Sequence, residues 1–292
     1  LPQTHVKTAT PYFKNFIKKY PTQKKLSEAS EDQILALWSG LGFYRRARNI
    51  YKTKEIIKEK YNNRFPKEFH QLLELPGIGK STAGAIMSLA YQNPHPILDG
   101  NVKRVITRLV NKNIDLLKES QLWDLSSQFV NKENCFAYTQ GIMDLGATVC
   151  TPTNPSCKDC PVQNQCMSAF NIINNKKRNV AQLKKVIPMN LSLIQTEDSL
   201  LLVKNEASSI WKNLWIPFES RSLESYTNSF KLTSSQKIKH ELTHRRLNIK
   251  LNTYISTNES EIKTNKKYKW IKKDRINEYG LPKPISKVIN EL

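Results

Sequence analysis

Apolar residues recur every three or four positions through most of residues 1–170, which is the spacing of an amphipathic helix. Capping signals mark two of the helix starts: Thr10 precedes Pro11 at a first helical position, and Ser30 with Gln33 forms a capping box. The pattern predicts helices over residues 11–20, 31–39, 45–61, 68–75, 80–91, 101–110, 121–131 and 138–149. Short Gly, Pro and Asn breaks separate them, so this part of the chain is predicted to be all-α.

The hydrophobic pattern changes after residue 170. Residues 171–185 are polar and basic, and Pro188 closes this stretch, which predicts a basic connector over 171–188. Short alternating or apolar runs follow and predict strands over residues 191–195, 199–203, 247–254 and 268–271. The sequence therefore predicts a multi-domain protein, with a helical domain over 1–170 and an α+β domain over 189–292.

The chain is strongly basic. It has 46 Lys and Arg against 25 Asp and Glu, a formal net charge of +21, and both predicted domains carry an excess of basic residues. Such an excess favours a polyanionic partner such as nucleic acid, although a lysine-rich solubilising surface accounts for part of it. No apolar run approaches the roughly 20 residues of a membrane span and no targeting segment is visible, so a cytoplasmic protein without membrane contact is expected.

Four cysteines, Cys150, Cys157, Cys160 and Cys166, lie within one short stretch of the chain. Four thiolates brought together by tight turns hold either tetrahedral zinc or a [4Fe-4S] cluster. The unequal spacing differs from the paired Cys-x2-Cys pattern of zinc sites and favours iron-sulfur, with zinc as the alternative. Disulfides are disfavoured because the chain has an odd number of cysteines, five, and no secretory signal.

Residues 75–83 form the string Leu-Pro-Gly-Ile-Gly-Lys-Ser-Thr-Ala between two predicted helices, which is a helix-hairpin-helix sequence. Its glycines, Gly77 and Gly79, allow backbone N–H groups to approach a phosphate, and the helix that starts at Lys80 adds unpaired donors and the positive end of its dipole. Contacts of this kind hold DNA without reading bases.

Asp99 follows the hairpin in an apolar setting, directly before a predicted helix. On its own, Asp99 with Gly100 would be interpreted as a turn and Asn101 as a helix cap. Next to a hairpin that anchors a DNA backbone, however, the carboxylate can stabilise positive charge developing on a deoxyribose, which is the chemistry of glycosidic-bond cleavage.

The hairpin, the aspartate and the cysteine loop together resemble the helix-hairpin-helix DNA glycosylases with an iron-sulfur cluster, and within them the MutY family of A/G-specific adenine glycosylases. The resemblance rests on residues 1–6, 40–49, 75–83, 97–104, 143–147 and 150–166. It continues more weakly through 199–203, 211–218 and 240–247, which resemble the Nudix-related domain of that family. The chain has no Nudix box with its glutamate cluster, so nucleotide hydrolysis is not expected.

The resemblance implies a monomeric, monofunctional enzyme of the bacterial nucleoid that removes adenine opposite 8-oxoguanine or guanine in double-stranded DNA, after flipping the base. It implies that Asp99 stabilises or attacks the oxocarbenium-like sugar and that Asn101 orients Asp99 and the adenine. Gln3, Thr4 and Phe43 would wedge into the duplex with support from Tyr44, and Thr243 with His244 would probe the oxidised guanine. Further DNA contacts are implied for Gly77, Gly79, Ser81, Thr82 and Lys103. Two positions depart from the family pattern, since Phe43 replaces a tyrosine and Leu242 a phenylalanine.

Ser81 separates two enzyme classes. The related endonuclease III enzymes carry a lysine there, which attacks the sugar as an amine, whereas a serine forms no Schiff base. Lys80 points about 100° away around the helix. The rival interpretations are an endonuclease III-like glycosylase/lyase and a non-catalytic DNA-binding iron-sulfur protein. The general-acid glutamate of the family lies upstream of the string that begins at Leu1, so impaired turnover is expected of these 292 residues.

Overall fold

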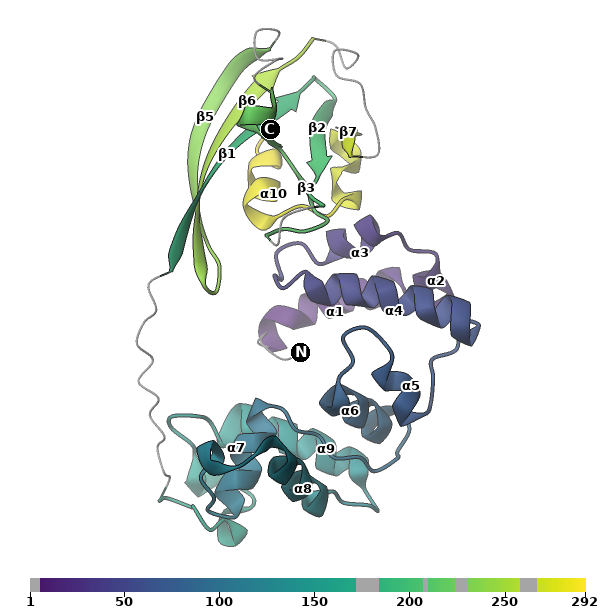
Figure 1. The fold of residues 1–292 in the computed structure, drawn as a ribbon, viewed down its shortest axis with the longest axis vertical. Helices are drawn as coiled ribbons and strands as arrows, with labels where there is room; N and C mark the ends of the chain where they lie inside the picture. Colours follow the sequence, from purple (N-terminus) through teal and green to yellow (C-terminus); the bar gives the residue numbers. More distant parts are fainter. Residues whose placement is uncertain (1–5, 172–183, 207–209, 224–229, 258–266) are drawn as a thin grey trace. The chain divides into compact units, whose positions relative to one another are not determined.

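A computed structural model describes residues 6–171, 184–206, 210–223, 230–257 and 267–292. The chain forms two compact units (Figure 1). We call residues 56–178 the hairpin unit, and residues 3–55 together with 179–292 the composite unit. No helix in the described ranges is both long and apolar enough to cross a membrane.

The hairpin unit is helical. It contains the end of α4 (Arg45–Tyr61), then α5 (Phe69–Leu73), α6 (Lys80–Ala90), α7 (Gly100–Leu109), α8 (Glu119–Phe129) and α9 (Cys135–Asp144), followed by a π-helical turn at Leu145–Val149. Two clusters of buried side chains fill it. One centres on Val102, Val105 and Ile106 of α7, and the other on Leu72, Leu75 and Met87 around the α5–α6 hairpin.

The helices of the composite unit are α1 (Val6–Lys19), α2 (Gln23–Ser27), α3 (Glu31–Leu37), the first part of α4, and α10 (Lys283–Ile289). The predicted capping box at Ser30 and Gln33 is present at the start of α3. The prediction for α1 was wrong at its start: the helix begins at Val6, so Pro11 lies inside it. The exposed proline lacks an N–H and so costs the helix one backbone hydrogen bond, while the preceding turn already fixes the helical path.

A mixed sheet of seven described strands forms the rest of the composite unit. The strands are β1 (Lys185–Gln195), β2 (Ser199–Lys204), β3 (Trp215–Ile216), β4 (Phe218–Glu219), β5 (Lys231–Glu241), β6 (Arg245–Ile255) and β7 (Tyr268–Lys272). The main order is β3-β2-β1-β6-β5, with β4 paired to β1 and β7 to β2. Only β1 and β6 pair in parallel among these strands; the β5–β6 pair is an antiparallel hairpin.

Two features of the sheet differ from the prediction. β1 begins at Lys185, inside the predicted connector, and residues 172–183 of that connector lie outside the described residues. Pro188 is accommodated because, among the described strands, this part of β1 pairs with β6 alone. β5 was not predicted, because its solvent face and much of its length are polar.

The N-terminal helices and the C-terminal sheet share one hydrophobic core. Ile34, Leu35 and Trp38 of the helical segment belong to the same buried cluster as Leu214 and Ile285. Polar links reinforce it: Asp32 Oδ1 accepts hydrogen bonds from Lys204 Nζ (3.2 Å) and Trp215 Nε1 (3.0 Å). Packing therefore joins residues 6–55 to the C-terminal part, whereas the hydrophobic pattern had grouped them with the other helices.

Gly280 tests this shared core. A Cβ at this position would lie 2.5 Å from Leu35 Cβ and 3.2 Å from Leu214 Cδ2. Overpacking of this kind costs about 1–3 kcal/mol, so Gly280→Ala should lower the free energy of unfolding by that amount in denaturant titration. The control is Gly141→Ala in α9, where an added Cβ meets nothing within 4 Å and the variant should be neutral or slightly stabilised. Equal stability of the two variants would contradict the shared core.

Candidate functional site

The predicted hairpin lies between α5 and α6. Gly77 has φ +85°, a conformation that residues with a Cβ rarely adopt, and Ile78 N donates to Leu75 O at 3.1 Å to close the turn. Gly79 is the N-cap of α6 and provides no side-chain cap, so the first-turn N–H groups of Lys80, Ser81 and Thr82 point out of the helix start. The arrangement presents backbone donors and the positive end of a helix at one place.

Asp99 is the N-cap of α7. Its Oδ1 accepts hydrogen bonds from the backbone N–H groups of Asn101 and Val102, both at 2.8 Å. These two bonds fix the orientation of the half-buried carboxylate at the helix N-terminus, and within the described part of the chain they use Oδ1 alone. The capping role considered for Asn101 therefore falls to Asp99 itself, because α7 begins at Gly100, one residue earlier than predicted.

One face of α6 holds the extended segment that leads to Asp99. Ser81 Oγ accepts a hydrogen bond from Leu98 N at 2.9 Å, and Ser88 Oγ accepts one from His95 N at 3.2 Å. Gly84 lies between these serines on the same helix face, where an added Cβ would overlap the carbonyl oxygen of Pro96. The helix backbone thus approaches the segment closely, and two hydroxyl groups satisfy its N–H groups.

A second helix, α8, holds the same segment. Ser126, which is fully buried, donates from Oγ to Ile97 O at 2.7 Å. Ile97 and Leu98 are themselves 2% and 6% exposed. Asp99 therefore follows a buried, hydrogen-bonded segment. Leu98, the residue directly before Asp99, is hydrogen-bonded to Ser81 at the start of α6.

Arg104 connects Asn101 to the end of α9. Its Nη2 donates to Asn101 Oδ1 at 2.9 Å and to Gly146 O at 2.6 Å, and its Nε donates to Cys150 O at 2.8 Å. Gly146 lies directly against Asn101, since an added Cβ would come 2.7 Å from Asn101 Cβ. Burial lowers the pKa of the Arg104 guanidinium. The Asn101 side chain thus accepts a hydrogen bond from Arg104, and the hydrogen bond between Asn101 and Asp99 in the described part of the chain is made by the Asn101 backbone N–H.

Arg108, one helical turn after Arg104, binds the cysteine loop. It donates from Nη1 to Thr151 O at 2.7 Å and from Nη2 to Pro152 O at 2.9 Å, and Nη1 lies 3.4 Å from Cys150 Sγ. The two arginines attach the loop to α7, the helix that Asp99 caps.

Cys150, Cys157, Cys160 and Cys166 line one cavity, together with Arg108. All four thiols are half-buried, and burial raises the pKa of Cys166, with the other three cysteines adding to the effect. Across the described ranges, however, no three His, Cys, Asp or Glu side chains gather closely enough to hold one metal ion. A single zinc needs four sulfurs at about 2.3 Å from one atom, whereas a multi-iron cluster occupies the space between more widely spaced sulfurs. Four thiols around one cavity are the donor set that a tetrathiolate site of either kind requires.

Thr82 and Lys103 are the remaining predicted site residues of the hairpin unit, and Lys80 is the neighbour of Ser81. Thr82 is exposed at the start of α6. Lys103 Nζ lies 3.8 Å from Glu119 Oε1, an ion pair that holds it near α8. Lys80 Nζ lies over the Trp123 ring, 4.1 Å from its centroid, in a cation–π contact.

Phe43 and Tyr44 belong to the composite unit. Phe43 has φ +49° and is 47% exposed, and the Arg46 guanidinium lies 5.5 Å from its ring centroid. Tyr44 packs against the shared core and donates from its hydroxyl to Leu281 O at 3.2 Å, the carbonyl that also accepts from Ser39 Oγ at 3.0 Å. Hydrogen bonds from Ser39 and Tyr44 to Leu281 therefore hold the loop between these two residues at both ends, while the loop exposes the Phe43 ring.

Gln3 and Thr4, the two N-terminal candidates, lie outside the described residues. Thr243 and His244 are exposed in the turn between β5 and β6, where Leu242 N donates to Arg245 O at 2.8 Å. Leu242 packs into the shared core and so anchors this turn.

Sequence reasoning singled out Ser81 for other roles but not as a residue that holds the segment before Asp99, and it assigned no role to the other positioning residues. Ser81, Gly84 and Ser88 recur at intervals of three and four, a signal for one face of α6, and Arg104 with Arg108 shows the same interval on α7. Ser126 and Gly146 carry no such signal, because their roles depend on which elements meet in space.

Known proteins resemble the chain over almost its whole length. Residues 1–122 match the HhH-GPD superfamily base excision DNA repair protein family, and residues 190–291 match the NUDIX domain family. An adenine DNA glycosylase of Buchnera aphidicola subsp. Schizaphis graminum is 38% identical, covering 99% of this chain and 88% of the relative. The Homo sapiens adenine DNA glycosylase is 38% identical and covers 57% of this chain and 31% of its own.

Solved structures support the helical part. A thermostable thymine-DNA glycosylase matches with a TM-score of 0.54 at 26% identity, over 59% of this chain and 81% of that chain. A non-covalent endonuclease III–DNA complex matches with a TM-score of 0.51 at 25% identity, over 57% and 78% respectively. The predicted fold class, a helical helix-hairpin-helix glycosylase domain followed by a Nudix-like domain, is confirmed.

Ser126 provides a test of the anchored segment. Ser126→Ala leaves the buried Ile97 carbonyl without its hydroxyl partner, which should cost about 1–3 kcal/mol of unfolding free energy. Its neighbour Ser127 is exposed and bonds only to carbonyls of its own helix, so Ser127→Ala should stay within about 0.5 kcal/mol of the wild type. Denaturant titration of both variants measures the difference. A Ser126→Ala variant as stable as Ser127→Ala would show that this bond does not hold the segment.

Proposed function

The chain belongs to the adenine DNA glycosylase family of base-excision repair enzymes, and we propose that it removes adenine mispaired with 8-oxoguanine or guanine in double-stranded DNA, acting as a monomer. The observation that carries this proposal is the Asp99 carboxylate, held at the start of α7 by two backbone N–H groups. Two such bonds keep the charged group in a fixed direction before any substrate arrives, which is the form of electrostatic stabilisation that favours a developing cation.

Asp99 is the catalytic residue in this proposal. Its carboxylate would face C1′ of the nucleoside flipped from the duplex and stabilise the oxocarbenium-like sugar as the bond to adenine breaks. Asn101 acts beside it, since Arg104 and Gly146 fix the position of its side chain. Ser81 positions Asp99 from the other side through the Leu98 N–H.

The hairpin would bind the DNA backbone. Gly77 and Gly79 leave the turn without side chains, and the open N–H groups at the start of α6, including those of Ser81 and Thr82, suit a phosphate. Because Ser81 also bonds to the segment before Asp99, the proposed phosphate contact and the proposed catalytic carboxylate belong to one connected set of hydrogen bonds. Lys103 adds positive charge on α7 close to Asp99.

Other proposed contacts lie in the composite unit. The exposed Phe43 ring, on a loop that Tyr44 fixes, suits insertion between bases, and Gln3 and Thr4 are proposed to act with it. Thr243 and His244, exposed in an anchored turn, are proposed to contact the base opposite the adenine. Each is exposed and offers polar groups to a base edge.

The cleavage is proposed to be monofunctional. A lyase needs an amine that reaches the sugar, whereas Ser81 offers a hydroxyl and the Lys80 ammonium is directed onto Trp123. The alternative, an endonuclease III-like glycosylase/lyase, predicts a covalent complex that borohydride traps in proportion to the enzyme.

Cys150, Cys157, Cys160 and Cys166 are proposed to hold a [4Fe-4S] cluster. When bound, the cluster supplies a rigid cross-link between the parts of the loop. Arg108 and Arg104 then connect this loop to the helix that Asp99 caps.

Asp99→Asn tests the proposed function. The variant should bind duplex with an A:8-oxoguanine pair as the wild type does, but release adenine at least about a hundredfold more slowly, because the amide carries no charge to stabilise the sugar cation. Asp124→Asn, an exposed substitution on α8 with the same change in charge, should release adenine at the wild-type rate. Single-turnover assays with protein in excess keep a slow release measurable. Unchanged release by the Asp99 variant would overturn the assignment.

The cofactor proposal has its own test. Cys160→Ala should lose the iron, the acid-labile sulfide and the visible absorption of an iron-thiolate cluster. Cys135→Ala should retain all three, since Cys135 is buried in α9 with its Sγ 3.7 Å from Ser88 O, away from the loop. Zinc in place of iron and sulfide in the wild-type protein would refute the proposed cluster.

A further inference from the structure

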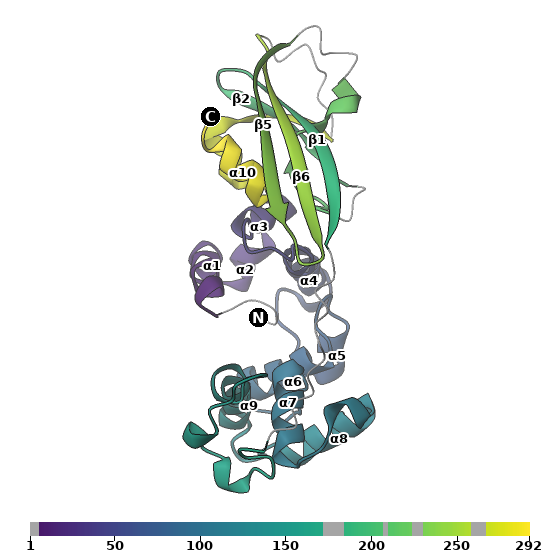
Figure 2. The ribbon, with the colours of Figure 1, turned by 90° about the vertical axis from the view of Figure 1, so that its left-hand side faces the viewer.

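The parallel and antiparallel pairing of β1, β6 and β5 creates a sheet with one buried and one open face. Leu247, Ile249 and Leu251 of β6 are buried on the inner side. The alternate residues Arg246, Asn248 and Lys250 are exposed on the outer side. Figure 2 looks onto this outer face, and no helix lies in front of it. We call it the outer sheet face.

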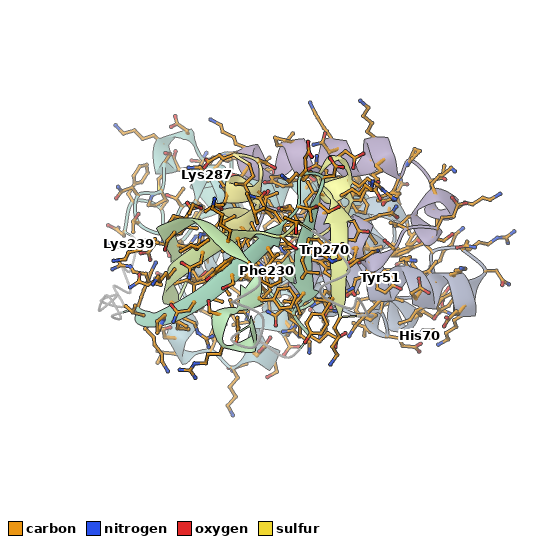
Figure 3. All side chains as sticks on the ribbon, turned by 90° about the horizontal axis from the view of Figure 1, so that it is seen from above. Tyr51, His70, Phe230, Lys239, Trp270 and Lys287 are labelled. Carbon is orange, nitrogen blue, oxygen red and sulfur yellow. The ribbon has the colours of Figure 1, made fainter. Side chains whose placement is uncertain are left out.

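The register brings lysines together on the outer sheet face. Lys237 of β5 lies directly opposite Lys250 of β6, and Lys239 follows two residues later, opposite Asn248. Lys239 projects outward from β5 in Figure 3. The described ion pairs include none for these three lysines, and the nearest carboxylate in the register, Glu241, is already paired with Arg246 and Lys184.

Two like charges in directly opposed positions destabilise a sheet, by a fraction of a kcal/mol to about 1 kcal/mol in the usual range of cross-strand pairs. The composite unit carries this cost at exposed positions, where neutral residues would avoid it. Bound anions would remove the repulsion, because they neutralise both ammonium groups at once. An extended polyanion suits the arrangement better than a single ion, because the charges continue along β5 and Asn248 and Asn190 add amide donors between them.

We propose that the outer sheet face binds the phosphate backbone of duplex DNA through Lys237, Lys239 and Lys250. The binding is independent of sequence and of the lesion, because lysine ammonium groups on this face contact phosphates and do not read base edges. The surface would hold undamaged duplex, so the Nudix-like part contributes general DNA affinity in addition to the proposed contacts of Thr243 and His244. The proposal rests on the proposed function only in taking duplex DNA as the partner.

The test uses the double variant Lys237→Gln/Lys250→Gln in the complete chain. Each phosphate contact contributes about −0.9 to the slope of log affinity against log salt, so loss of two contacts should reduce the magnitude of that slope by roughly 1–2. The affinity for an undamaged duplex should fall by about tenfold or more at low salt, equally for different sequences. Fluorescence anisotropy across a salt series measures both quantities.

The matched control is Lys272→Gln/Lys287→Gln, which removes the same charge from exposed lysines of the same unit on β7 and α10. Lys287 is labelled in Figure 3 on a different element from Lys239. This control should leave the salt slope unchanged. Without DNA, the Lys237/Lys250 variant should melt at the same temperature as the wild type or higher, because it removes a like-charge pair; this excludes misfolding as the cause of weaker binding.

Two outcomes separate this inference from the proposed function. If the wild-type chain binds duplex DNA and the Lys237/Lys250 variant binds with the same affinity and salt slope, the outer sheet face is not a DNA surface, while the proposed function stands. If the variant loses affinity and slope but releases adenine at the wild-type rate under saturating single-turnover conditions, the surface contributes binding and the catalytic assignment is unaffected.

Discussion

The placement of the Asp99 carboxylate depends on hydrogen bonds to buried backbone. A segment as buried as Ile97 and Leu98 must satisfy its own N–H and C=O groups, and here serines from two helices do so. The same bonds fix where the chain enters α7, and the first N–H groups of α7 then fix the carboxylate itself. The carboxylate that we propose as catalytic is thus positioned by neutral side chains and backbone, so its orientation does not depend on a bound substrate.

α7 also links the two sites of the hairpin unit. Asp99 caps its start, Arg104 bonds to Asn101 and to the end of α9, and Arg108 bonds to the carbonyls that open the cysteine loop. Because a helix of ten residues is rigid over this length, a displacement of the loop reaches the carboxylate through one element. The proposed cluster would therefore support the catalytic end without taking part in bond cleavage.

The sequence predicted the parts of the fold that local rules determine. The capping box at Ser30 and the long amphipathic run of α4 gave helices whose positions the structure confirms, and the glycines of the hairpin gave a tight turn. It did not predict that residues 6–55 pack on the C-terminal sheet, because an amphipathic face shows that a helix buries one side but not against which partner. β5 was not predicted either, because its inner face is only half buried and carries Gln236, Ile238 and His240, so the strand shows no apolar alternation. Arg104 was visible as a basic residue, but only the fold shows that it faces Asn101 and Cys150.

Net charge also indicates a function without locating the surface that performs it. A formal charge of +21 favours a polyanionic partner, yet composition alone does not distinguish a binding surface from a lysine-rich coat. Strand register provides that distinction, because it fixes which lysines face one another. Where Arg246 meets Glu241 the charges cancel, and where Lys237 meets Lys250 they add. The opposed Lys237 and Lys250 therefore form the pair whose repulsion the proposed DNA contact would neutralise.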